Sequence, residues 1–164
     1  MASSLEVNGL DAGYGAVRVL EDVSIRVSAG ETVVLLGTNG NGKSTLMKCI
    51  MGILPPAAGS IIAEIDGEPI DLVGRSTEAI VDLGISLVPE GRRLFPKLSV
   101  EEILAVLFRL NEGGLAIVLI EHIMRTVMRF STRLVILVAG QKIADGMPQQ
   151  AIESPEVERA YLGE

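Results

Sequence analysis

Tryptophan is absent from this chain of 164 residues, and cysteine and histidine each occur once. A single cysteine cannot close an internal disulfide, which excludes the class of small secreted domains held together by disulfides. One histidine and one cysteine are also too few ligands for a structural zinc site. Cys49 lies in an apolar segment of helical pattern, so we expect a small core residue rather than a reactive thiol.

Long apolar runs are missing as well, since runs such as LAIVLI at residues 115–120 are far too short to span a bilayer. The opening MASSLEVNGL has no basic segment followed by an apolar core, so we expect no secretory signal and a cytosolic location. The net charge of -7 argues against nucleic acid as the main partner. The composition therefore predicts a soluble chain with no transmembrane segment of its own.

Short apolar runs alternate with helical patterns along the chain. The predicted strands are residues 23–27, 32–36, 60–65, 85–89 and 115–120, followed by a hairpin at 133–146. The predicted helices are residues 44–54, 77–84, 100–111 and 123–130, and a terminal helix with Ser154 as cap and Pro155 at its first position. This alternation indicates a single α/β domain with a mostly parallel sheet core and helices on both faces.

The segment GTNGNGKST, residues 37–45, follows the predicted strand TVVLL and opens a helix. It matches the P-loop pattern G-x-x-x-x-G-K-[ST], in which glycines let backbone N–H groups surround phosphate oxygens. Lys43 is expected to reach the terminal phosphates of ATP, and Ser44 to place its hydroxyl on Mg²⁺. The candidate cofactor-binding residues in this loop are Gly37, Asn39, Gly40, Gly42, Lys43, Ser44 and Thr45. A glycine-rich turn without a ligand is the alternative, and kinases, GTPases and transporter ATPases all remain open.

The order LEVNGLDAGYGAVRVLEDVSIRVSAGETVVLLGTNGNGKSTL resembles the nucleotide-binding subunit of an ABC transporter. The resemblance implies a P-loop NTPase-like fold with an N-terminal antiparallel β portion. It also implies that Tyr14 stacks on adenine, a role that suits an aromatic ring; a packing tyrosine is the alternative. Asn41 departs from the family pattern, where a small alanine is usual. We expect the loop to tolerate it, with a perturbed loop as the alternative.

The stretch VPEGRRLFP, residues 88–96, resembles the branch of the family that serves branched-chain amino acid importers, and the ending SPEVERAYLG supports the same branch. In this loop the family carries a glutamine near Mg²⁺ and the attacking water, and Glu90 stands at that position here. The resemblance therefore implies that Glu90 is a metal-binding and catalytic residue, with an ordinary carboxylate at a strand end as the alternative.

His122 in LAIVLIEHIM matches the switch histidine of the family, which approaches the γ-phosphate after a buried strand. The resemblance implies that His122 is catalytic; a structural histidine is the alternative. Glu121 before it is not expected to be the catalytic acid, because the residues that follow match the segment after the switch histidine.

Residues 96–114, PKLSVEEILAVLFRLNEGG, join what the resemblance suggests are two different helices. Family members carry a helical subdomain, an LSGGQ-type signature and a strand ending in Asp-Glu before the switch strand, and residues 97–121 contain none of these. We infer an internal deletion near residues 99–103, where the two helices share VEE. The junction fits a natural short protein, an engineered one, or a longer protein whose middle segment is missing here.

The joined segment still predicts a helix. Ser99 and Glu102 are expected to form a capping box, and one face is apolar: Val100, Ile103, Leu104, Leu107 and Phe108. Without the acidic strand we expect hydrolysis to be slow or absent, because the attacking water lacks its base. The lost strand is expected beside residues 85–89, so the sheet either closes over the gap or leaves apolar edges exposed.

Residues 1–164 are therefore predicted to be one shortened ABC-type nucleotide-binding domain, from the ATP-binding subunit of an importer for branched-chain amino acids. The resemblance implies membrane permease subunits and a second ABC ATPase, identical or different, as partners. It places the chain peripherally on the cytoplasmic face of the cell membrane. The alternative is an ATP-binding module without turnover that contacts a partner through Leu94 and Phe95. A small-molecule P-loop kinase fits less well, because it leaves His122 and residues 88–96 unexplained.

Overall fold

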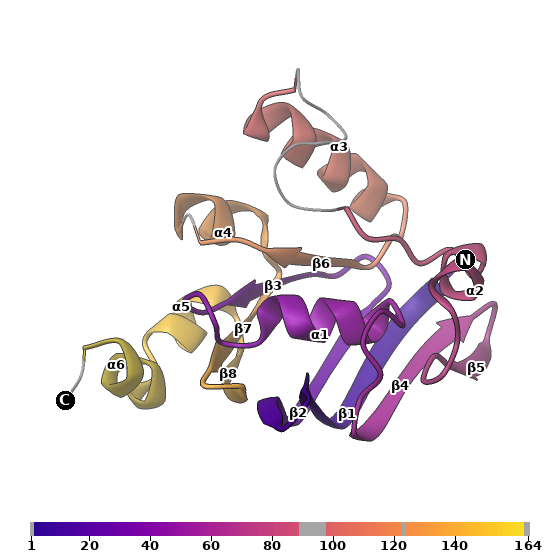
Figure 1. Cartoon of the computed structure of the whole chain (residues 1–164). Coiled ribbons are helices and arrows are strands. Elements are labelled where there is room, and N and C mark those ends of the chain that lie inside the picture. The colour runs from indigo at the N-terminus through magenta and orange to yellow at the C-terminus, as the bar shows by residue number, and fades with distance from the viewer. Residues whose placement is uncertain (1, 89–97, 123, 163–164) are drawn as a thin grey trace.

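The computed structural model of the chain describes residues 2–88, 98–122 and 124–162 (Figure 1). Within these residues the strands form two four-stranded sheets, in the orders β2-β1-β4-β5 and β6-β3-β7-β8. The expected α/β class with a parallel core and an N-terminal antiparallel portion is confirmed. No helix in the described part of the chain is long and apolar enough to cross a membrane.

The antiparallel sheet consists of β1 (Ala2–Tyr14), β2 (Val17–Ser28), β4 (Ala58–Ile65) and β5 (Glu68–Asp71). Each neighbouring pair in this sheet runs antiparallel. The sequence analysis did not predict β1 and β5 individually. Polar and glycine residues interrupt the apolar alternation of β1, and the register shifts beside Gly9, where φ is 55°, mark the same irregularity.

The second sheet is centred on β3 (Thr32–Leu36), which pairs in parallel with β6 (Ile117–Ile120) and β7 (Arg133–Val138). β8 (Gln141–Gly146) closes the predicted hairpin antiparallel to β7. Successive residues of β3 face two cores. Val33 and Leu35 join the larger core with the antiparallel sheet, whereas Val34 joins the smaller one. Burial on both faces explains why β3 reads as a continuous apolar run.

The helices are α1 (Lys43–Ile50), α2 (Thr77–Asp82), α3 (Val100–Glu112), α4 (Met124–Phe130), α5 (Pro148–Ile152) and α6 (Pro155–Leu162). α1 packs into the larger core through Leu46, Cys49 and Ile50. The smaller core takes Val127 from α4, Ala151 from α5 and Val157 from α6. The parallel sheet is therefore covered on one face by α1 together with the antiparallel sheet, and on the other by the C-terminal helices.

The prediction of a strand at residues 85–89 is wrong for the part that the structure describes. Residues 85–88 form no regular structure, and Pro89 lies outside the described residues. Ile85 and Leu87 still pack against the larger core. Both side chains are only partly buried, and Val88 is 61% exposed. The apolar pattern therefore indicated contact with the core, but a strand also needs a hydrogen-bonding neighbour. In the described sheet the order ends at β6, which pairs only with β3.

Helix α3 stands apart from both sheets (Figure 1). The predicted capping box is present: the Glu102 carboxylate accepts from the Ser99 N–H at 2.8 Å, and the Glu102 N–H donates to Ser99 Oγ at 3.2 Å. The apolar face is only partly buried, because Leu104 is 6% exposed whereas Phe108 is 50% exposed. The apolar face therefore stays partly exposed at Phe108, since the helix has little of the core beneath it.

Candidate functional site

The loop between β3 and α1 has a backbone that only glycine adopts easily. Gly37, Gly40 and Gly42 have φ values of 150°, 87° and 93°. A side chain at Gly37 would overlap the Leu137 carbonyl, and one at Gly42 would overlap the side chain of Leu20. Gly37 and Gly42 are thus required both by conformation and by the close approach of neighbouring segments, whereas Gly40 is favoured by conformation alone.

Lys43 lies at the first position of α1 with only 7% of its surface exposed. Its ammonium donates to the carbonyl oxygens of Gly37 at 2.6 Å and Thr38 at 2.9 Å, so the side chain folds back across the loop. A buried ammonium requires such acceptors, and phosphate oxygens are stronger ones because they are charged. Lys43 is therefore held at the place where a phosphate bound by the loop would meet it.

The N-terminus of α1 is open to an anion. It has no side-chain cap and no acidic residue in its first turn, so its partial positive charge is not neutralised locally. Ser44 is exposed, whereas Thr45 is buried. The Ser44 hydroxyl is thus accessible to a ligand.

Tyr14 ends β1 and is 46% exposed. Its hydroxyl accepts a hydrogen bond from Lys48 Nζ at 3.2 Å. Hydrogen bonds from the side chains of Thr45 and then Lys48 lower the pKa of the Tyr14 phenol. Two residues of α1, one helical turn apart, therefore hold Tyr14 by its hydroxyl while much of the ring stays accessible.

His122 follows β6 at the same edge of the sheet as the P-loop. Leu35 of β3 pairs with Ile120 of β6 in a parallel register. Gly37 and His122 each come two residues later, so both lie at the carboxyl edge of the sheet, where ligands of open α/β sheets usually bind. The His122 N–H donates to the Glu121 carboxylate at 3.1 Å, and the His122 side chain is exposed.

Topology thus brings the P-loop, Tyr14 and His122 to one region of the molecule. Glu90, the remaining predicted catalytic and metal-binding residue, lies outside the described residues, as do Leu94 and Phe95. The roles assigned to these residues stay predictions. Cys49 is buried, and burial raises the pKa of its thiol to about 11, which agrees with an unreactive core residue.

Sequence reasoning missed two polar residues beside the loop. The helical spacing of Thr45 and Lys48 shows that both side chains lie on one face of α1. It does not show that Tyr14 of β1 lies beside that face, because this depends on how β1 packs. Asn41 was noticed only as a departure from the family pattern. In the structure its Nδ2 donates to Thr38 Oγ1 at 2.9 Å, and its Oδ1 accepts from the Ala139 N–H at 3.1 Å.

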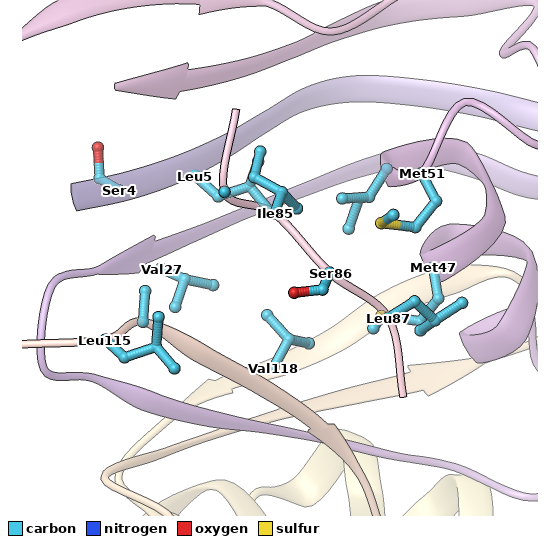
Figure 2. Close-up of a pocket in the computed structure, with 13 residues that line it drawn as sticks. Ser4, Leu5, Val27, Met47, Met51, Ile85, Ser86, Leu87, Leu115 and Val118 are labelled. Atoms are coloured by element: carbon cyan, nitrogen blue, oxygen red, sulfur yellow. The ribbon is translucent and has the colours of Figure 1, made fainter. Parts of the chain in front are cut away.

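A separate apolar pocket of about 150 Å³ lies between α1, the segment 84–88 and the start of β6 (Figure 2). Its labelled lining is mainly aliphatic and methionine side chains from these elements and from the two long strands β1 and β2. Ser4 and Ser86 are polar residues that line it, and none of the lining residues that the structure describes is charged. The described lining therefore offers no charged group for phosphate or for acid–base chemistry.

Comparison with known proteins gives a consistent family assignment. Residues 20–155 match the ABC transporter family model. The chain is 48% identical over 93 residues to the high-affinity branched-chain amino acid transport ATP-binding protein BraG of Pseudomonas aeruginosa, covering 57% of this chain and 38% of that protein. It is 50% identical over 70 residues to the probable ribonucleotide transport ATP-binding protein mkl of Mycobacterium bovis, covering 43% of this chain and 19% of that protein.

The ribose import ATP-binding protein RbsA of Chromobacterium violaceum is 42% identical over 96 residues, which cover 58% of this chain and 18% of that protein. The chain thus spans well under half the length of these curated relatives. Among solved structures, a nucleotide-free ATP-binding cassette from an ABC transporter superposes with a TM-score of 0.79 at 17% identity, covering 100% of both chains. At that identity the superposition establishes the fold alone.

Proposed function

The chain belongs to the ABC transporter family, and from this premise we propose that it binds Mg-ATP as the ATP-binding subunit of an importer for branched-chain amino acids. The observation that carries the proposal is the P-loop itself. Its glycines hold a conformation with positive φ, the uncapped helix α1 begins behind it, and Lys43 rests on two loop carbonyls. This set of donors fits phosphate groups.

In this proposal each part of the nucleotide has its own residue. Tyr14 offers a ring for the base, the loop and Lys43 hold the phosphates, and the exposed Ser44 hydroxyl is available to Mg²⁺. His122 lies at the same sheet edge for the γ-phosphate, and Glu90 is the remaining proposed ligand. Within the described residues no group of three His, Cys, Asp or Glu side chains converges on a metal site. In the proposal Mg²⁺ would be held by Ser44 and Glu90, with phosphate oxygens and water as its other ligands, as is usual for this ion.

The substrate branch rests on sequence likeness. BraG is named for branched-chain amino acid transport, whereas mkl and RbsA are named for ribonucleotide transport and ribose import. Residues 88–96 and the C-terminal SPEVERAYLG support the first of these. We further propose that permease subunits and a second ABC subunit carrying a signature motif are the partners, at the cytoplasmic face of the membrane.

A second candidate function, ATP binding without turnover, is favoured by the strand ends of the parallel sheet. Among the described residues β3, β6 and β7 are followed by Gly37, Glu121 and Ala139, and none is followed by a pair of acidic residues. An internal deletion near residues 99–103 accounts for this, since β6 ends the described sheet where a further strand would pair. Loss of the base predicts a rate about 10² to 10⁴ lower than that of an intact cassette.

The test is equilibrium binding of Mg-ATP together with phosphate release, measured on the chain and on its Lys43→Ala variant. Arg125→Ala, at an exposed position of α4, is the matched control for removing a cation. We expect binding that only Lys43→Ala abolishes, and slow phosphate release or none. Equal binding of Mg-ATP by the chain and by Lys43→Ala would contradict the proposed function. Rapid phosphate release by the unchanged chain would agree with ATP binding but would contradict the second candidate function, binding without turnover.

A further inference from the structure

Asn41 links two segments that lie far apart in the sequence. Its amide nitrogen donates to Thr38 Oγ1 at 2.9 Å, across the P-loop. Its amide oxygen accepts at 3.1 Å from the N–H of Ala139, in the turn between β7 and β8. An alanine at this position could make neither bond. The side chain of Asn41 thus ties the P-loop to a strand connection that follows it by almost a hundred residues.

The turn that receives this tie is itself held firmly. The Gly140 carbonyl accepts from the Glu21 N–H of β2 at 2.9 Å, and Gln141 Nε2 donates to the Glu21 carboxylate at 3.0 Å. Gly140 has φ of 79°, and a side chain there would overlap the Val19 carbonyl. The β7–β8 turn is therefore packed against β2, and Asn41 bonds to a turn that is itself held by hydrogen bonds.

The P-loop needs such a tie when its ligand arrives. The Lys43 ammonium holds the Gly37 and Thr38 carbonyls together. A bound phosphate would compete for that ammonium because its oxygens are charged acceptors, and the two carbonyls would then lose this contact. The Asn41 side chain holds Thr38 through its hydroxyl, so this contact does not involve the carbonyl that Lys43 binds. The backbone N–H of Asn41 also donates to the Thr38 carbonyl, at 3.4 Å.

We propose that Asn41 is a positioning residue that latches the P-loop to the β7–β8 turn and thereby keeps the loop shaped for phosphate before and during binding. The latch rests on the proposed function of the loop as an ATP site. Asn41 itself bonds to protein atoms, so it acts through the loop backbone rather than on the reacting groups. A preformed loop loses less conformational freedom on binding, which strengthens binding.

The test compares Asn41→Ala with the unchanged chain in binding Mg-ATP and, separately, inorganic triphosphate with Mg²⁺. We expect both affinities to fall by the same factor, about three- to tenfold, because two ordinary hydrogen bonds are lost and no base contact is touched. Asn8→Ala, at an exposed position of β1, is the matched control and is expected to leave both unchanged. Unchanged or tighter binding by Asn41→Ala, or weakening for ATP alone, overturns the latch.

Thr38→Val gives a second variant that removes one of the two bonds and keeps Asn41 in place. Its loss of affinity is expected to be smaller than that of Asn41→Ala, and the double variant is expected to lose less than the sum of the two. Strict additivity would mean that Asn41 does not act through Thr38 and would overturn that half of the latch.

Hydrogen exchange of the Ala139 amide in the ligand-free chain tests the other bond without any nucleotide. We expect exchange to be about tenfold faster in Asn41→Ala than in the unchanged chain, because the amide loses its acceptor. Equal rates overturn the latch even where ATP does not bind. A different result would contradict the proposed function, namely equal ATP binding by the unchanged chain and by Lys43→Ala.

Discussion

The ammonium of Lys48 and the hydroxyl of Tyr14 lie 3.2 Å apart, joining the end of β1 to the helix that follows the P-loop. The Lys48 nitrogen is 5.4 Å from the ring centroid, so it meets the ring at its hydroxyl end rather than over a face. The faces of Tyr14 are therefore not covered by this lysine. Helix α1 would therefore position both ends of the nucleotide: it holds Tyr14, on which the base would stack, and it begins at the loop that would bind the phosphates.

Removal of the Lys48 ammonium is expected to raise the pKa of Tyr14 toward its ordinary value. The pKa is lowered in the fold because Thr45 and Lys48 stabilise the phenolate, and Lys48→Met removes one of these donors. Ultraviolet titration of phenolate absorbance measures the change, and Tyr14→Phe identifies the Tyr14 signal against that of Tyr161. Arg125→Met is the control and is expected to leave the pKa of Tyr14 unchanged. An unchanged pKa of Tyr14 in Lys48→Met would contradict the hydrogen bond between Lys48 and Tyr14.

The ion-pair cluster around Arg133 is expected to make stability depend on acid pH. Arg133 bonds to Glu31 at 2.9 Å and to Asp145 at 2.6 Å, and Lys142 reaches Asp145 at 2.8 Å. Burial alone raises the pKa of Asp145, but hydrogen bonds from Lys142 and Arg133 outweigh it, so the pKa is lowered overall. The stabilisation is therefore present above the unfolded pKa and is lost as the pH falls through the lower folded value.

The Asp145→Asn variant tests this dependence. We expect it to lower the free energy of unfolding by about 1 kcal/mol at pH 7, since the ion pairs are only partly buried. The difference from the unchanged chain is expected to shrink as the pH falls below about 4, where the carboxylate of the unfolded chain begins to bind protons, and to vanish as the pH falls through the lower folded pKa. Urea unfolding at several pH values measures it, and a difference independent of pH would argue against the ion pairs as its source.

Truncation of the central strand is expected to be strongly destabilising. Leu35 of β3 is fully buried in the larger core, so Leu35→Ala leaves a cavity and is expected to cost about 2–5 kcal/mol of unfolding free energy. Val17→Ala, at a position 66% exposed in β2, is expected to change stability by less than about 0.5 kcal/mol. Denaturant unfolding followed by circular dichroism measures both, and a similar small effect for both would contradict the described core.

Exposed apolar residues of α3 are expected to promote self-association. Val106, Phe108 and Leu110 are 40%, 50% and 48% exposed on a helix that stands apart from the sheets (Figure 1). Phe108→Ser is therefore expected to reduce concentration-dependent light scattering with little loss of stability. Leu104→Ser, at a buried position of the same helix, is the contrasting control and is expected to destabilise the chain. Unchanged scattering in Phe108→Ser would remove α3 as the source of association.

Local sequence signals predicted the elements whose causes are local. The P-loop and α1, the capping box of Ser99 and Glu102, and the β7–β8 hairpin were placed from residue type and spacing alone. Helix α1 ends at Ile50, earlier than the predicted residue 54, because Gly52 turns the chain with φ of 67°. Residues 85–88 were wrongly predicted to be a strand, because a strand depends on a hydrogen-bonding neighbour that no local pattern shows.

The sequence by itself determined the phosphate loop, because glycine freedom, a lysine and a helix start act within nine consecutive residues, Gly37 to Thr45. It also determined the alternation of strands and helices, since apolar periodicity is a property of each segment. Only the tertiary structure decided where β1 lies, which brings Tyr14 to Lys48. It also decided that Asn41 reaches Ala139. These contacts join residues separated by 34 and 98 positions. Their formation depends on how the sheets pack, which no local pattern encodes.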